Sequence, residues 1–112
     1  MNGKGSRNEG FAVTNDILQV YPNIVGIFAI NDPSGLGAYA AIDKVNKTDQ
    51  ITIVAFDASP AGKQGVFEGK LFDTPQQFPR KMAVGTVESF IKHLEGETVE
   101  KAIFIPLSLI HI

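Results

Sequence analysis

The chain of 112 residues contains no cysteine and no tryptophan, and it has only two histidines. Without cysteine it forms neither disulfides nor thiolate metal sites, and the isolated His93 and His111 are not spaced as metal ligands. No stretch reaches the roughly 20 apolar residues of a transmembrane helix. The first residues also lack the apolar core of a signal peptide. We therefore expect no metal site and no cofactor.

Long runs of like charge are absent too, and the formal net charge is −2. A nucleic-acid partner would need a basic face, so none is expected. The 44% hydrophobic and 20% charged residues are typical of a globular chain with one domain.

What the sequence does contain is an alternation of strand and helix patterns. Ile24–Ile30 and Ile51–Phe56 are short, nearly unbroken apolar runs, as in strands covered on both faces of a parallel sheet. Leu71–Gln77 and Ala102–Ile105 are weaker strand candidates. Helical spacing precedes the first of these four segments and follows every one of them except the last. These patterns predict an α/β fold, a three-layer α/β/α sandwich with a mostly parallel sheet.

Two helix starts carry the same signal, a capping residue followed by proline. Asp32 before Pro33 and Ser59 before Pro60 are both predicted N-caps. Gly35 lies just inside the first of these helices, and we interpret it as a site of close helix–strand packing. The neighbouring Gly37 is given the same interpretation, because the third glycine of a dinucleotide-binding loop is missing.

Polar side chains follow three of the predicted strands. Asn31 and Asp32 end the first, Asp57 ends the second and Gln77 ends the third. Open α/β sheets bind ligands beyond the carboxyl ends of their strands. A carboxylate accepts hydrogen bonds from adjacent hydroxyls, and an amide both donates and accepts, which suits a sugar. Asn31 and Asp57 are equally compatible with a turn that has no ligand, and Asp32 is better explained as a cap.

No Ser, His and Asp arrangement for nucleophilic catalysis is visible, so the chain is not expected to be an enzyme. A phospho-acceptor role for Asp57 would need a paired acidic cluster after an earlier strand and a later lysine, and neither is present.

Three segments resemble the ribose-type periplasmic sugar-binding proteins of ABC transporters. They are Asn8–Ala38, Ile51–Asp57 (with Ala55 where the family usually has glycine) and Glu68–Pro79. The resemblance runs from about Arg7 to Pro106. It implies a two-lobed, extracytoplasmic protein that closes on a monosaccharide by a hinge motion and delivers it to the transporter permease. It also implies that Asn31, Asp57 and Gln77 bind the sugar, and it places the usual stacking aromatic near Gly5, where this chain has none.

The same resemblance suggests how the chain is organised. Residues 1–106 would form a partial binding-protein domain, with a second-lobe remnant at 7–77 and a hinge with a crossing helix and strand at 78–106. The first lobe and the first strands of the second would be missing. The edge of Ile24–Ile30 would then be exposed, which invites self-association.

The last six residues, 107–112, do not continue the family pattern. We interpret them as a non-native tail, since they resemble a translated transposon end from a sequencing library; an ordinary apolar strand is the alternative.

The effector-binding domain of a LacI-type repressor shares the predicted fold and is the main alternative function. Thr48–Gln50 lacks the proline lead-in usual in those repressors, and Thr74–Gln77 differs from their hinge stretch. Both features favour the transporter protein.

Overall fold

The computed structural model describes residues 2–110, which form two compact units. The first unit runs to Gln76 and includes Leu109 and Ile110, and the second is Gln77–Ser108. In the first unit the elements are α1 (Arg7–Val20), β1 (Gly26–Phe28), α2 (Asp32–Lys44), β2 (Thr52–Val54) and α3 (Pro60–Phe67). The second unit contains α4 (Pro79–Leu94).

The sheet of the first unit is parallel. Gly26 of β1 lies opposite Thr52 of β2, and Phe28 lies opposite Val54. The predicted third strand is present only as two isolated parallel bridges, Val54 with Asp73 and Asp57 with Gln76. The α/β class with a parallel sheet is thus confirmed, but the prediction of a regular strand over Leu71–Gln77 is wrong. Pro75 breaks the ladder, because proline has no N–H to donate.

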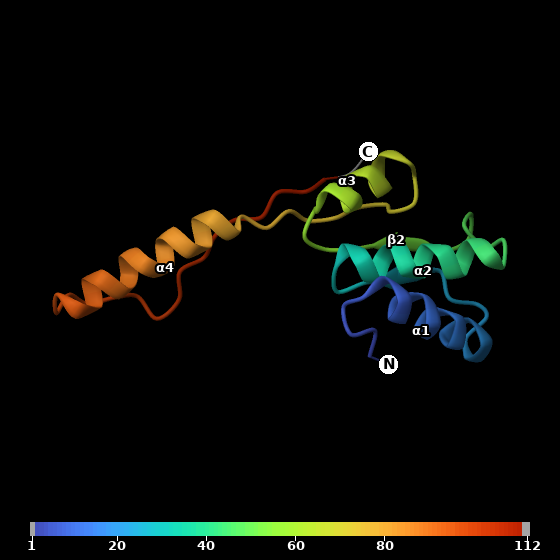
Figure 1. Ribbon diagram of the computed structural model, residues 1–112, viewed down its shortest axis with the longest axis horizontal. Helices are drawn as coiled ribbons and strands as arrows, with labels where there is room; N and C mark the ends of the chain where they lie inside the picture. The colour runs from blue at the N-terminus through green and yellow to red at the C-terminus, as the bar shows by residue number, and fades with distance from the viewer. Residues whose placement is uncertain (1, 111–112) are drawn as a thin grey trace. The chain divides into compact units, whose positions relative to one another are not determined.

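Side chains alternate between the two faces of this sheet, as a period of two requires. Ala29, Ile53 and Ala55 are buried in the core. Figure 1 shows α2 running alongside β2. Phe28 and Ile30 point the other way and are 70% and 72% exposed. The prediction that the Ile24–Ile30 strand is covered on both faces is therefore wrong within this unit. The apolar sequence makes the strand suited to burial on both faces, but one face is uncovered in this unit.

Helices α1 and α2 lie side by side (Figure 1) because glycines let their backbones approach. A Cβ on Gly10 would lie 2.6 Å from the carbonyl oxygen of Ser34, and one on Gly37 would overlap the carbonyl of Arg7. Gly35 instead faces the sheet, with its Cβ position 2.9 Å from the Cβ of Ala55. The predicted helix–strand packing is confirmed for Gly35, whereas Gly37 packs against another helix.

We expect Gly37→Ala to lower the free energy of unfolding of the first unit by about 1–3 kcal/mol, because backbone must move to admit the methyl group. Urea unfolding followed by circular dichroism measures this. Gly85→Ala is the control, since open space surrounds that position in α4 and alanine favours a helix. Equal unfolding midpoints for Gly37→Ala and the parent would contradict the close helix contact.

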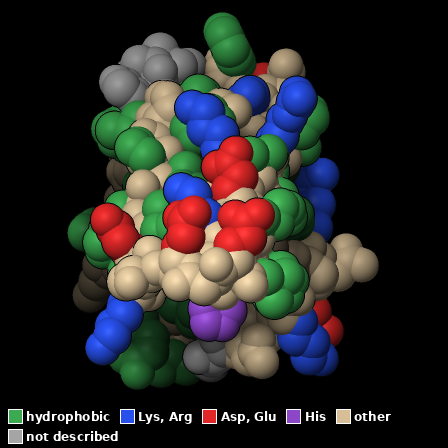
Figure 2. All heavy atoms as spheres, turned by 90° about the vertical axis from the view of Figure 1, so that its left-hand side faces the viewer, with side chains coloured by type: hydrophobic (Ala, Val, Ile, Leu, Met, Phe, Trp, Pro, Cys, Tyr) green, Lys and Arg blue, Asp and Glu red, His purple; other side chains and the backbone are tan. Residues whose placement is uncertain are grey.

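The second unit has little core of its own. No residue of α4 is buried, and its apolar side chains are exposed; they include Met82, Val84, Val87, Phe90, Ile91 and Leu94. Figure 2 shows hydrophobic side chains exposed between acidic and basic ones. The predicted amphipathic helix is present, but the predicted strand over Ala102–Ile105 is irregular. A strand needs a neighbour to pair with, and the described residues offer this segment none.

None of the helices within residues 2–110 is long and apolar enough to cross a membrane. Of the predicted tail, Ile110 accepts a backbone hydrogen bond from Thr74 (3.1 Å), and residues 111–112, including His111, lie outside the described part of the chain. The non-native origin of the tail stays a prediction.

Candidate functional site

The carboxyl ends of the strands meet at one edge of the first unit. Asp32, after β1, donates its backbone N–H to the carbonyl of Phe56, after β2 (2.9 Å). Asp57 in turn donates its backbone N–H to the carbonyl of Pro75 (2.9 Å). The structure therefore brings the segments that carry Asn31 and Asp57 together, as parallel pairing predicts.

Asn31 is already engaged by protein groups. Its Oδ1 accepts the backbone N–H of Ser34 (3.0 Å), and its Nδ2 donates to the carbonyl of Gly5 (3.0 Å). These two partners fix the orientation of the amide, because a flipped amide would face donor with donor and acceptor with acceptor. One N–H and one lone pair remain for a ligand. Asn31 can thus bind a hydroxyl while it holds the start of α2.

The N-cap of α2 is Asn31, not Asp32, so the prediction of Asp32 as a cap is wrong. Asp32 is the first helical residue and is fully buried. Its Oδ1 accepts the hydroxyl of Thr74 (2.6 Å), and its Oδ2 accepts the backbone N–H of Ser59 (2.6 Å). The sequence gives no local signal for this cluster, because Thr74 is 42 residues away along the chain.

Asp57 lies in an unusual backbone conformation. Its φ is +105°, and the next residue, Ala58, has φ +50°. Residues with a Cβ seldom adopt positive φ, and such positions concentrate at functional sites. The predicted N-cap Ser59 follows and is confirmed, since its Oγ accepts the N–H of Gly62 (3.1 Å). Asp57 therefore lies in a sharp, strained turn between β2 and α3.

Gln77 is placed in the other unit. The residue bridged to Asp57 is Gln76, one position earlier, and Gln77 opens the second unit. There it helps to line a cavity of about 470 Å³ together with Met82 and Thr86 of α4 and Phe104 of the returning segment. A sugar-binding role for Gln77 stays a prediction.

Gly5 occupies the place where the resemblance expects a stacking aromatic. Its φ is +67°, and an added Cβ would lie 2.9 Å from Nδ2 of Asn31. An aromatic side chain at this position would require a different backbone and would displace the Asn31 amide. The sequence alone showed that the ring is missing, and the structure shows that Gly5 serves Asn31 instead.

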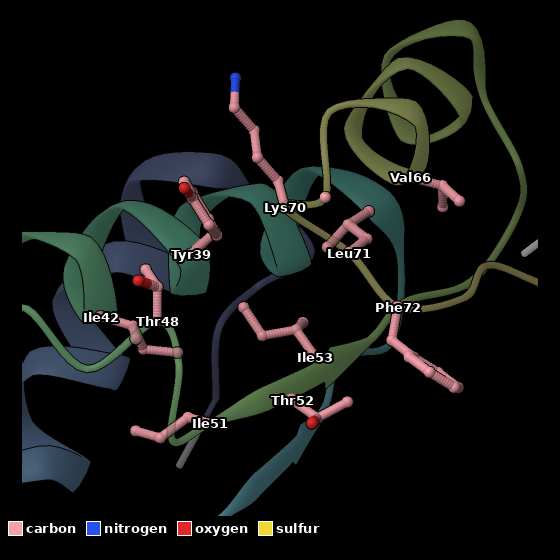
Figure 3. Close-up of a pocket in the computed structure, with 11 residues that line it drawn as sticks. Tyr39, Ile42, Thr48, Ile51, Thr52, Ile53, Val66, Lys70, Leu71 and Phe72 are labelled. Atoms are coloured by element: carbon pink, nitrogen blue, oxygen red, sulfur yellow. The ribbon is translucent and has the colours of Figure 1, made fainter. Parts of the chain in front are cut away.

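A smaller hollow of about 240 Å³ lies near the amino end of β2, away from the predicted site (Figure 3). Its polar lining residues are Tyr39, Thr48, Thr52 and Lys70. Lys70 forms an ion pair with Glu68. The hydrogen bond that Lys70 donates to Glu68, together with a second one from Gln64, lowers the pKa of the Glu68 carboxyl. The lysine is thus engaged outside the hollow.

Metal-binding clusters are absent among residues 2–110, where no three His, Cys, Asp or Glu side chains gather. The strand-end edge carries a carboxylate, which can accept hydrogen bonds, and a partly engaged amide, which can still donate one and accept one.

A parallel α/β unit with polar side chains at its carboxyl edge belongs to the open α/β proteins, which bind ligands at that edge. The family model described as "periplasmic binding protein domain" matches residues 1–98. The chain belongs to this family.

Relatives with named functions agree with this assignment. The ribose import binding protein of Escherichia coli is 35% identical over 104 residues, which are 93% of this chain and 35% of the relative. The chain thus spans about a third of the length of the curated relatives that it matches. Such names favour the import protein over the repressor alternative.

Solved structures support the same fold. A solute binding protein of Bacillus halodurans, with bound myo-inositol, is 32% identical with a TM-score of 0.79; the match covers 96% of this chain and 37% of that one. A glucose–galactose binding protein of Geobacillus stearothermophilus has a TM-score of 0.87 at 17% identity, covering 95% and 38%, and supports the fold alone.

Proposed function

We propose that this chain is the sugar-contacting part of an extracytoplasmic binding protein that delivers a monosaccharide to an ABC-type permease. The observation that carries the proposal is the backbone hydrogen bond from Asp32 to Phe56. It brings the segments that carry Asn31 and Asp57 to one edge of the sheet, in a chain of this family. A relative is named for ribose import, and a structural neighbour holds myo-inositol. Both ligands are rich in hydroxyl groups.

The two side chains would form different hydrogen bonds with the sugar. The Asp57 carboxylate accepts hydrogen bonds from sugar hydroxyls, and charge makes these bonds stronger than neutral ones. Asn31 adds one donor and one acceptor. A sugar contact by Gln77 stays a separate prediction from the sequence. The relative named above is an import binding protein, so the role that we propose is binding without catalysis.

A graft tests this function. Residues 1–98 would replace the aligned segment of the Escherichia coli ribose import binding protein, and calorimetry would measure binding of D-ribose, D-allose, D-galactose, D-xylose and myo-inositol. We expect binding of at least one sugar, and at least about 100-fold weaker binding by the chain alone, because it supplies only part of the contacts. A folded graft that binds none of the five would contradict the proposal.

We further propose that the chain alone self-associates through β1. Among the described residues this strand hydrogen-bonds only to β2, and Phe28 and Ile30 on its open face are exposed. Unpaired strand edges and apolar faces favour pairing with another chain.

We expect the molar mass measured by light scattering to rise with protein concentration. The double variant Phe28→Lys/Ile30→Lys should have the mass of a monomer. Phe67→Lys is the matched control, because Phe67 is 78% exposed on α3 and away from β1. A monomer at all concentrations would exclude this association.

A further inference from the structure

Asp32 and Thr74 form a buried pair directly beneath the turn that carries Asp57. Both side chains are fully buried. The Thr74 hydroxyl donates to Asp32 (2.6 Å) and at the same time accepts the backbone N–H of Ala58 (3.0 Å). The other carboxylate oxygen of Asp32 accepts the N–H of Ser59 (2.6 Å).

These contacts satisfy most of the backbone N–H groups of the turn. Three consecutive N–H groups are held: that of Asp57 by the Pro75 carbonyl, that of Ala58 by Thr74 and that of Ser59 by Asp32. Two of the three acceptors therefore belong to the buried pair. The turn needs such support, because Asp57 and Ala58 both have positive φ and neither is glycine.

The pair has no other evident task. Asn31 already caps α2, so Asp32 is not needed for that purpose. The first turn of α3 is pressed against the Asp32 carboxylate, since a Cβ on Gly62 would overlap its oxygens. Such a tightly enclosed carboxylate has to be satisfied by its fixed partners, and those partners are the turn amide and Thr74.

We propose that Asp32 and Thr74 are positioning residues that hold the Asp57–Ala58 turn in its left-handed conformation and so aim the Asp57 carboxylate at the ligand. This proposal deepens the function proposed above and rests on it for the ligand. The backbone φ of Asp57 sets the direction in which its side chain leaves the chain. A turn freed from the pair relaxes toward ordinary φ values and withdraws the carboxylate from the sugar.

Two substitutions at Thr74 separate the hydroxyl from packing. Thr74→Val keeps the shape and removes the hydroxyl, whereas Thr74→Ser keeps the hydroxyl. In the chain of 112 residues, we expect Thr74→Val to speed hydrogen exchange of the Ala58 amide at least about tenfold. Exchange of the core amide of Ala55 should stay within about threefold of the parent, which shows that the unit remains folded. Thr74→Ser should restore slow exchange at Ala58.

The second measurement is the affinity of the graft for the sugar that it binds most tightly in the panel. We expect Thr74→Val to weaken binding about tenfold or more and Thr74→Ser to recover it. Thr52→Val is the control, since Thr52 is exposed on β2. The proposal is overturned if Thr74→Val leaves Ala58 exchange unchanged, if it speeds exchange without weakening binding, or if Thr74→Ser behaves like Thr74→Val.

A failure of the proposed function looks different. In that case Asp57→Ala leaves sugar binding unchanged, or the graft binds no sugar. The exchange of Ala58 still decides whether the pair holds the turn, because it is measured without ligand.

Discussion

Asp57→Ala is expected to weaken monosaccharide binding by the graft more than about 100-fold, which is loss of detectable binding in an ordinary titration. The carboxylate would accept hydrogen bonds from two sugar hydroxyls, and bonds to a charged group contribute about 1.5–3 kcal/mol each. Calorimetry with the sugar that binds most tightly measures the effect.

The control for this result is a second aspartate next to the same strand. Asp49 is exposed and precedes β2, at the opposite end from Asp57. Asp49→Ala removes the same charge from the chain, so it separates a local contact from a general electrostatic effect. Unchanged affinity in Asp57→Ala would remove this residue from the site.

Ile42→Ala is expected to unfold the first unit or bring it close to unfolding. Ile42 is one of the largest completely buried side chains of the core. Truncating such a side chain costs about 2–5 kcal/mol, because the lost burial is joined by the cost of a cavity. A unit of this size is stable by only about 4–12 kcal/mol. Urea unfolding of the chain gives the midpoint.

Val45→Ala is the matched control for that measurement. Val45 follows α2 and is 43% exposed, so its truncation should change the free energy of unfolding by less than about 1 kcal/mol. If Ile42→Ala and Val45→Ala unfold at the same urea concentration, the core does not depend on the packing of α2 over the sheet.

The sequence predicted the order of the elements in the first unit and the edge to which the segments with Asn31 and Asp57 are brought. It could do so because apolar runs, proline after a capping residue and glycine at close contacts are local signals. The observed strands, Gly26–Phe28 and Thr52–Val54, are shorter than the predicted apolar runs, because only three residues of each are paired in the ladder.

The errors arose where distant residues decide the structure. Asn31 and Asp32 are both good N-caps, and a proline fits either the first or the second helical position. Only Thr74 and Ser59 reveal that Asp32 points into the protein. Likewise, Ala102–Ile105 has the composition of a strand but no neighbouring strand in the described residues, and pairing cannot be seen in a segment taken alone.

The double engagement of Asn31 limits how a new specificity could be built at this edge. Serine or threonine would still cap α2, but either would be too short to replace the bond to the Gly5 carbonyl as well. Aspartate would keep the cap and would set a carboxylate oxygen against that carbonyl. Engineers who seek a different sugar therefore have more freedom elsewhere in the site, because each change at Asn31 also redesigns a helix start and a turn.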